Sequence, residues 1–309
     1  MSPTRHLGLD LGGTNIKLVV VERSGDPDGS PRVVATDLVS THADAGPDAV
    51  TMRIIEAARA GAGTHGPVAS VGVGVPGLFD SRTGVIELFP NLPGPWPGYP
   101  LRDRLADGIG QPVRLINDAR AFLLAEAAMG AGRGASTLIG LTLGTGIGGA
   151  VIVDGRLRLG PTGTAGEIGH QTIDPDGPVC GCGNRGCPEV LAQAATIARL
   201  GGHETAEAVF DAARAGDPQA VEAVDAAARA LGIAIANMIT VLVPDAVVLG
   251  GGMAGAGEVI VEPIRAVVRR HAPLVPDAAD RIVLAELGTS AGAIGAAIAG
   301  AGIGIDAVS

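Results

Sequence analysis

Two short apolar runs open the chain, at residues 6–11 and 16–22, and a Gly-Gly-Thr-Asn turn separates them. The turn is too short for a crossover connection, so we predict a β-hairpin rather than a strand that enters a helix. A strand near 32–39, an amphipathic helix near 47–62 and a buried strand within 68–77 follow. The first part of the chain is therefore predicted to be an α/β unit.

A Gly- and Pro-rich segment at 78–112 comes next, and this composition favours an ordered functional loop over a linker. It contains the single Trp and the single Tyr, which could cover a sugar face or serve in packing. The run at 113–118 predicts a strand that ends in Asn117 and Asp118, and the stretch at 120–132 predicts the helix after it. We expect this strand to lie in the centre of its sheet.

The pattern of the opening hairpin returns at residues 137–155, where a Gly/Thr turn again joins two apolar runs. This similarity indicates a weak internal repeat and a second α/β lobe. The remaining periodic segments predict helices at 188–200, 204–215, 218–242, 258–271 and 290–300, and strands at 246–252 and 281–286.

Length and composition point to two globular lobes. With 309 residues the chain exceeds what one hydrophobic core usually organises, so we expect two lobes with a cleft between them. Hydrophobic residues make up 47% and charged residues 17%, as in globular proteins. Aromatic residues are only 2% and glycines number 49, so close backbone packing must replace bulky side chains, although an Ala/Gly/Arg-rich genome would raise the same count.

Charge and the N-terminal sequence exclude several classes of function. The net charge of −10 and the lack of Lys or Arg runs argue against nucleic-acid binding. Residues 1–13 lack the apolar core of a signal peptide, and no stretch offers about 20 uninterrupted apolar residues. We therefore expect a cytoplasmic protein without a membrane partner.

Three cysteines and one histidine form the most specific chemical signal. Cys180, Cys182 and Cys187 lie within eight residues, an odd number and an awkward spacing for disulfides, and His170 precedes them. Three thiolates and one imidazole are the donor set of a closed, tetrahedral Zn²⁺ site, so we predict structural zinc bound by these four residues. Redox-active or inert buried cysteines remain the alternative.

Two Gly/Thr turns are candidates for phosphate binding. The first, at 10–15, places the carboxylate of Asp10 before two glycines, so backbone N–H groups could face an anion while Asp10 holds a hydrated Mg²⁺. The second, at 144–149, resembles a dinucleotide fingerprint but lies between two strands, and neither turn has the spacing of a P-loop. Two such hairpins suggest the actin-like phosphotransferase fold, with an ordinary glycine hairpin as the alternative for the first turn.

Asn117 and Asp118 place polar side chains at the carboxyl end of a strand, where α/β proteins bring their ligands. Phosphoryl transfer needs a group that orients the attacking hydroxyl and accepts its proton, so Asp118 is the predicted general base. The alternative is that Asp118 only caps the N-terminus of the following helix.

Two further carboxylates lie close to the predicted metal ligands. Glu167 precedes His170 by three residues, and Glu189 follows Cys187 by two. Metal binding would bring both carboxylates into one neighbourhood, where they could accept hydrogen bonds from sugar hydroxyls. An ordinary solvated surface position is the alternative for either residue.

Taken together, these motifs resemble the ROK family of bacterial sugar kinases and related repressors. Over nearly the whole chain they occur in the family's order, as DLGGTN, GVPG, NDARAF, LGTGIGGA, AGEIGH, CGCGNRGCPE and VVLGGG. The resemblance implies a two-lobed, hexokinase-like and actin-like α/β fold with ribonuclease H-like lobes at 1–118 and 119–288, the C-terminal helix at 289–309 completing the first. It also implies ATP between the lobes, Mg²⁺, and a homodimer, as is usual among similar proteins.

The resemblance further implies roles for individual residues. For ATP and its phosphates these are Asp10, Gly12, Gly13, Thr14, Asn15, Gly144, Thr145, Gly146, Gly251 and Gly252. For the sugar they are Asn91, Asn117, Asp118, Glu167, His170 and Glu189. His170 would then face the sugar with one ring nitrogen and zinc with the other.

The predicted activity is ATP-dependent phosphorylation of a hexose at its 6-hydroxyl, as in glucokinases. Arg120 and Pro188 stand where family members commonly have Asn and Leu, so an amino sugar such as kanosamine, N-acetylglucosamine or N-acetylmannosamine is the alternative substrate. A sugar-sensing repressor is a further alternative. Repressors carry a DNA-binding head, however, and here the first phosphate motif begins within ten residues of the N-terminus.

Overall fold

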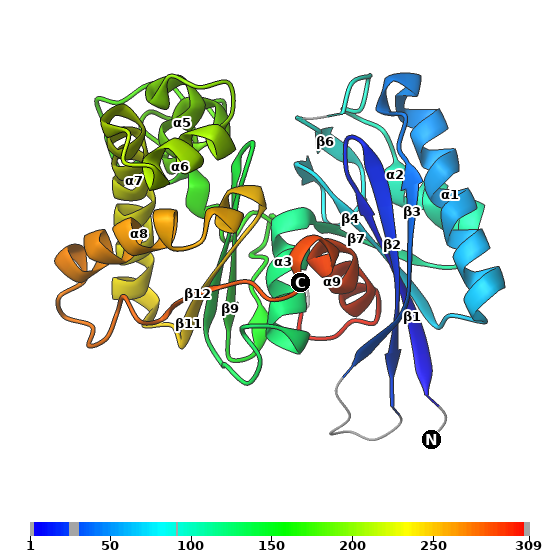
Figure 1. Ribbon diagram of the computed structural model, residues 1–309. Coiled ribbons are helices and arrows are strands. Elements are labelled where there is room, and N and C mark those ends of the chain that lie inside the picture. The colour runs from blue at the N-terminus through cyan, green and yellow to red at the C-terminus, as the bar shows by residue number, and fades with distance from the viewer. Residues whose placement is uncertain (1–2, 25–30, 91, 306–309) are drawn as a thin grey trace. The chain divides into compact units, whose positions relative to one another are not determined.

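The computed structural model describes residues 3–24, 31–90 and 92–305, and the chain divides into two compact units. Unit 1 contains Met1–Gly134, Arg156–Ala165 and Thr289–Ser309, and unit 2 contains Ala135–Gly155 and Gly166–Gly288. Each unit has a β-sheet with helices packed against it, which confirms the predicted α/β class (Figure 1). The domain boundary after residue 118 stays a prediction.

The sheet of unit 1 has the strand order β3-β2-β1-β4-β7. β1 and β2 form the predicted hairpin, β3 continues it antiparallel, β4 runs parallel to β1, and β7 runs parallel to β4. The strands are Thr4–Leu11 (β1), Asn15–Arg23 (β2), Arg32–Ser40 (β3), Ser70–Val75 (β4) and Val113–Asn117 (β7). β7 is thus an edge strand, and the prediction of a central strand was wrong. An apolar run indicates that both faces of a strand are buried, but it does not indicate how many strands pair with it.

One helix of unit 1 lies inside the segment that was predicted to be a loop. α2 (Leu101–Ile109) buries Leu101 and Leu105 one turn apart, a signal too short to stand out among the surrounding prolines and glycines. The other helices and short elements are η1 (Ala43–Ala45), α1 (Gly46–His65), β5 (Leu78–Phe79), β6 (Ile86–Leu88), α3 (Asp118–Met129), β10 (Arg156–Leu157) and α9 (Ala291–Gly300).

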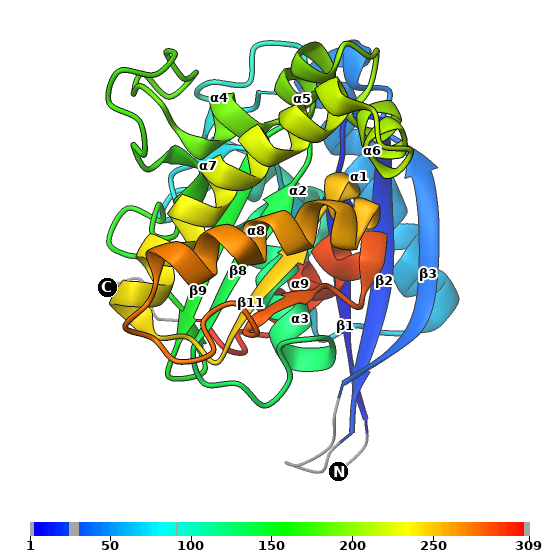
Figure 2. The same cartoon turned by 60° about the vertical axis from the view of Figure 1, so that its left-hand side comes forward.

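Backbone contact replaces bulky side chains where α9 packs inside unit 1. A Cβ on Gly72 would lie 1.8 Å from the carbonyl oxygen of Ala296, and a Cβ on Gly295 would lie 1.8 Å from the carbonyl oxygen of Ala121. Only glycine therefore permits this approach of α9 to β4 and to α3. α3 and α9 lie side by side in Figures 1 and 2. The high glycine content thus has a structural use.

The strands of unit 2 repeat the order of the first sheet. β8 (Leu138–Leu143) and β9 (Ile147–Val153) form the second predicted hairpin, and β11 (Ala246–Gly250) runs parallel to β8 and to β12 (Ile282–Leu284). The order β9-β8-β11-β12 matches β2-β1-β4-β7 of unit 1. The internal repeat in the sequence corresponds to this shared topology.

The helix predicted at 188–200 is two helices, so this prediction was wrong. The extended backbone of Gln193 separates α4 (Pro188–Ala192) from α5 (Ala194–Gly201). The Ala194 N–H donates to the carbonyl oxygen of Gly144 at 3.0 Å, which takes it out of the helical hydrogen-bond pattern. The remaining elements are η2 (Ile168–His170), α6 (Ala206–Arg214), α7 (Pro218–Leu242), η3 (Gly252–Ala256), α8 (Glu258–His271) and η4 (Gly288–Ser290).

Among the described residues, α7 alone is long and apolar enough to cross a bilayer, by length and composition. Of its most apolar window, 56% is buried inside the protein. Ala227, Leu231 and Ile235 follow one another at four-residue spacing on the buried side, and α8 packs along α7 (Figure 2). This pattern is typical of a central core helix.

Candidate active site and metal centre

The first Gly/Thr turn is a tight connection between β1 and β2. The Gly12 N–H donates to the carbonyl oxygen of Asn15 at 3.0 Å, which closes the turn. Thr41, buried just after β3, holds it from the side, because its hydroxyl donates to the Gly12 carbonyl at 2.7 Å and its N–H to the Thr14 carbonyl at 2.9 Å. Gly13 and Thr14 are exposed, as an anion-binding turn requires. Thr41 carried no sequence signal that would link it to this turn.

Asp10 lies directly before this turn in a partly buried position. A Cβ on Gly292, in the first turn of α9, would lie 2.5 Å from its Oδ2, so glycine leaves room for the carboxylate. Burial, and next the charge of Asp118, raise the pKa of Asp10 to about 6, while its cross-strand partner Lys17 lowers it. A nearby cation favours the ionised form of such a carboxyl group, so the position suits the predicted Mg²⁺.

Asn117 ends β7 and caps α3. Its Oδ1 accepts hydrogen bonds from the N–H groups of Ala119 at 3.0 Å and Arg120 at 3.3 Å, and its Nδ2 donates to the Gly77 carbonyl at 3.2 Å. The N-cap is therefore Asn117, and the alternative that made Asp118 the cap was wrong. Asp118 is the first residue of the helix and lies exposed, where a carboxylate can exchange a proton with a ligand.

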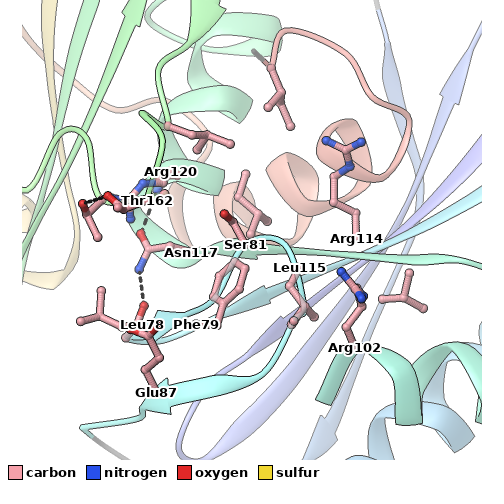
Figure 3. A pocket seen from close by; sticks show the side chains of 18 residues that line it. Leu78, Phe79, Ser81, Glu87, Arg102, Arg114, Leu115, Asn117, Arg120 and Thr162 are labelled. Carbon is pink, nitrogen blue, oxygen red and sulfur yellow. Dashed lines mark hydrogen bonds between the residues drawn. The ribbon is translucent and has the colours of Figure 1, made fainter. Parts of the chain in front are cut away.

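A cavity of about 440 Å³ runs along the edge strand β7 in unit 1 (Figure 3). This volume lies within the range of small-molecule sites. Asn117 and Arg120 both line it, and Arg120 is only 2% exposed, with its Nη2 donating to the carbonyl oxygen of Ala165 at 3.1 Å. The position at which the chain departs from the family pattern thus borders the same cavity as a predicted sugar contact.

Three residues of the segment 78–112 were considered for sugar contact, namely Asn91, Trp96 and Tyr99. Asn91 lies outside the described residues, so its role stays a prediction. Trp96 is 1% exposed and packs against Phe89 and Tyr99, with ring centroids 4.8 Å and 5.5 Å away. Its Nε1 donates to the carbonyl oxygen of Pro93 at 3.2 Å. Trp96 is therefore a packing residue.

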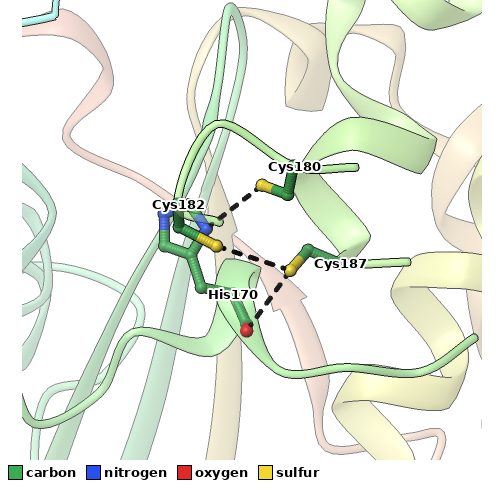
Figure 4. Close-up of side chains that lie close together, drawn as sticks. All are labelled: His170, Cys180, Cys182 and Cys187. Carbon is green, nitrogen blue, oxygen red and sulfur yellow. Dashed lines mark hydrogen bonds between the residues drawn. The ribbon is translucent and has the colours of Figure 1, made fainter. Parts of the chain in front are cut away.

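The side chains of His170, Cys180, Cys182 and Cys187 converge in unit 2 (Figure 4). Their ligand atoms all lie within 4.8 Å of one another. The sulfurs of Cys182 and Cys187 are 3.7 Å apart, and the Cys180 sulfur lies 3.7 Å from Nδ1 of His170. Ligands at zinc–sulfur and zinc–nitrogen bond lengths on a tetrahedron are separated by roughly 3.6–3.8 Å, so the cluster fits zinc.

A short hairpin and a helix terminus position the thiols. The Cys180 N–H donates to the carbonyl oxygen of Asn184 at 2.7 Å, which closes the hairpin. Gly186 has a φ of +57°, and a Cβ there would lie 1.8 Å from the carbonyl oxygen of Asp174, so only glycine fits. The chain then reaches Cys187, the N-cap residue of α4.

Burial raises the pKa of Cys187 to about 12 and also raises that of Cys180. At the exposed Cys182, hydrogen bonds from the Asn184 N–H and from the other two thiols outweigh burial and lower the pKa. Zinc binds thiolates, so it has to displace thiol protons, and its affinity is expected to fall at low pH.

The ring of His170 lies between the thiols and Glu189. Its Nδ1 faces Cys180, whereas its Nε2 lies 4.0 Å from Oε2 of Glu189, so the two nitrogens face different groups. Glu189 has 24% of its side chain exposed, so it is not a solvated surface carboxylate. Glu167 is partly buried at the N-terminus of η2. The structure thus brings His170 and Glu189 together, and Glu167 precedes His170 by three residues in the chain.

The second Gly/Thr turn connects β8 to β9. The Gly144 N–H donates to the carbonyl oxygen of Gly146 at 3.0 Å. Gly251, with a φ of +86°, packs at the base of this turn, since a Cβ there would lie 2.4 Å from the Leu143 carbonyl oxygen. Gly252 begins η3 directly after it. The residues predicted to contact the nucleotide from unit 2 therefore lie in two adjacent turns, and their role in binding stays a prediction.

Known proteins resemble this chain over nearly its full length. The sequence profile of the ROK family matches residues 6–300. A glucokinase of Thermotoga maritima is 38% identical over 285 residues, which cover 86% of this chain and 87% of the relative. A ROK hexokinase structure from Thermus thermophilus has a TM-score of 0.82 at 36% identity, covering 96% of this chain and 98% of the other. A ROK family glucokinase from Streptomyces griseus, solved with glucose and AMPPNP, has a TM-score of 0.79 at 33% identity, covering 96% and 99%.

An amino-sugar kinase and a repressor are also similar to this chain, but they differ in the share of their length that the chain covers. An N-acetyl-D-glucosamine kinase of Vibrio cholerae is 33% identical, covering 94% of this chain and 98% of the relative. A xylose repressor of Caldicellulosiruptor bescii is 31% identical, covering 66% of this chain and 55% of the repressor. The chain therefore matches kinases over almost their whole length and the repressor over about half.

Proposed function

This chain belongs to the ROK family, and from that membership we propose that it is an ATP-dependent hexose kinase of the glucokinase type. The near full-length similarity to glucokinases and hexokinases supports the reaction class. Within the structure, the observation that carries the proposal is the exposed carboxylate of Asp118, at the carboxyl end of β7 and next to Asn117 at the cavity. The acceptor is the 6-hydroxyl of a hexose.

In this reaction Asp118 is the general base. It accepts the proton of the sugar hydroxyl while the hydroxyl oxygen bonds to the γ-phosphorus and the bond to the leaving ADP breaks. Asn117 supports this step, because its cap hydrogen bonds fix the first turn of α3. Asp10 holds Mg²⁺, which when bound neutralises charge on the phosphates. The turn at residues 12–15 presents backbone N–H groups to a phosphate.

The proposed roles in unit 2 concern the nucleotide, the sugar and zinc. Gly144, Thr145 and Gly146 form the second phosphate turn, and Gly251 and Gly252 contact the nucleotide. Glu167, His170 and Glu189, together with Asn91 of unit 1, contact sugar hydroxyls. His170 and the three cysteines would supply all four ligands of a tetrahedral zinc, which would hold residues in place rather than act as a Lewis acid.

An amino-sugar kinase is the second candidate. The similarity to an N-acetyl-D-glucosamine kinase supports it, and so does Arg120, which lines the same cavity as Asn117. We further propose that the enzyme acts in the cytoplasm as a homodimer and without a nucleic-acid partner. The net charge of −10 supports the last point.

A coupled ADP-release assay tests these proposals. Zinc-loaded protein with Mg-ATP is offered glucose, mannose, fructose, their amino and N-acetyl derivatives, and kanosamine, and NMR of the product identifies the phosphorylated hydroxyl. We expect the highest kcat/KM with glucose. A higher value with an amino sugar would select the second candidate. ADP release no faster than that of the Asp118→Asn variant, for every sugar, would refute the kinase.

A further inference from the structure

Ile147, the residue directly after the second Gly/Thr turn, is held from two sides by segments that carry zinc ligands. Its N–H donates to Oε2 of Glu189 at 3.0 Å. Its carbonyl oxygen lies against Gly169, where a Cβ would approach to 1.9 Å. Gly169 directly precedes the ligand His170, and Glu189 follows the ligand Cys187 by two residues. Both neighbours of Ile147 therefore lie within two residues of proposed zinc ligands along the chain.

The same segments also contact the turn itself. A Cβ on Gly146 would lie 2.7 Å from Oε2 of Glu189, so the carboxylate packs directly on the turn. The carbonyl oxygen of Gly144 accepts its hydrogen bond from Ala194, the first residue of α5. α4 begins immediately after Cys187, so the placement of Glu189 and of α5 depends on where this ligand is held.

From these contacts we propose that zinc positions the second phosphate turn, and that Glu189 is the positioning residue that connects the metal cluster to it. The proposal rests on the proposed function, because it takes residues 144–146 as a binding site for the phosphates of ATP. Oε2 of Glu189 binds Ile147 and faces His170, and Oε1 lies 3.9 Å from the Cys180 sulfur. Loss of zinc releases His170 and Cys187, and with them the groups that hold the turn.

A coupling of this kind is a free energy shared by two sites, so it acts in both directions. Zinc raises the affinity for the nucleotide, and the nucleotide raises the affinity for zinc by the same factor. We expect about a fivefold effect, at the lower end of typical couplings between sites.

The unmodified protein provides the first test. Calorimetric titration of zinc-loaded protein with Mg-AMPPNP measures nucleotide binding, and competition with a chromogenic chelator measures zinc affinity with and without saturating Mg-AMPPNP. The expected result is that AMPPNP tightens zinc binding about fivefold. If AMPPNP binds and zinc affinity is unchanged within error, the coupling is refuted and the kinase stands. If AMPPNP does not bind to the zinc-loaded protein, both proposals fail.

Two glutamate variants separate positioning from sugar contact. Glu167→Ala is the matched control, because Glu167 is also a proposed sugar contact and also lies near a zinc ligand along the chain. Both Glu189→Ala and Glu167→Ala should raise the KM for the sugar. Only Glu189→Ala should weaken AMPPNP binding about fivefold and remove the effect of AMPPNP on zinc affinity, and Glu189→Gln, which keeps an acceptor oxygen, should restore part of both. If the effect persists in Glu189→Ala, Glu189 is not the connecting residue.

Discussion

The charge of Asp118 raises the pKa of Asp10 although one strand of the sheet lies between the two residues. Asp10 lies on β1, Asp118 directly follows β7, and β4 is the strand between β1 and β7. Burial acts in the same direction with a larger effect, and the pKa reaches about 6. In the proposed mechanism, one carboxylate of this pair receives a cation and the other receives a proton, which is the division of labour that phosphoryl transfer needs.

The raised pKa predicts that Asp10→Asn stabilises the protein at neutral pH in the absence of Mg²⁺. The unfolded chain loses this proton near pH 4, whereas the folded protein keeps it up to about pH 6. The stability that Asp10 contributes is therefore fully present below about pH 4 and is lost as the pH rises through 6. A shift of two pKa units corresponds to about 3 kcal/mol at most.

Urea unfolding of wild type and variant at pH 4.5 and pH 8 measures this effect. The gain in the free energy of unfolding that Asp10→Asn brings over wild type should be larger at pH 8 than at pH 4.5 by about 1–3 kcal/mol. Zinc release at low pH affects both proteins, so it cancels in their difference. Asp107→Asn, at an exposed position on α2, serves as the control. Equal gains at both pH values would contradict the assigned pKa.

Asp118→Asn should lower kcat about a thousandfold, because the variant cannot accept the proton of the attacking hydroxyl. The KM for the sugar should change little, since the side chain is exposed and keeps its shape. The free energy of unfolding at neutral pH should rise slightly, because the variant no longer raises the pKa of Asp10. Steady-state kinetics and urea unfolding check both points. A variant that retains a tenth of the wild-type kcat would remove Asp118 from the mechanism.

Asn117→Ala should lower the free energy of unfolding by about 1–2 kcal/mol, because α3 loses the cap that accepts from Ala119 and Arg120. Asn117→Ser keeps a capping oxygen and should recover most of this loss. If the cap also orients Asp118, kcat should decrease in the order wild type, Asn117→Ser, Asn117→Ala. Equal stability of the Ser and Ala variants in urea unfolding would mean that the cap does not stabilise α3.

Cys182→Ser should reduce the zinc content from one ion per chain to nearly none, measured by elemental analysis after dialysis. Cys182 is the exposed thiol of the cluster, so its replacement disturbs no core packing. The variant should unfold at the same temperature as wild type stripped by a chelator. A zinc content that stays at one per chain would show that the ligand set is wrong.

The sequence predicted the features that depend on neighbouring residues. The two hairpins follow from Gly/Thr turns between apolar runs, and the clustering of the thiols follows from the spacing of Cys180, Cys182 and Cys187, because each of these signals lies within a few residues of chain. The alternative that made Asp118 the cap of α3 was one residue too late, because both neighbours are residue types that cap helices.

Features that depend on distant contacts could not be predicted in this way. The break at Gln193 reflects the hydrogen bond from Ala194 to Gly144, and the support of the first turn comes from Thr41. The edge position of β7 is set by the order of strands, and a strand's own residues do not encode that order. These are tertiary interactions that override local propensity.

The packing of α9 against β4 and α3 has a consequence for protein synthesis. α9 begins at Ala291, whereas β1 ends at Leu11 and β4 ends at Val75, so the ribosome makes these strands long before the helix that packs on them. Until then their apolar residues lack this cover, and closing a contact over such a length of chain is slow. We expect the nascent chain to form unit 2 first, and to rely on chaperones until α9 has emerged from the ribosome.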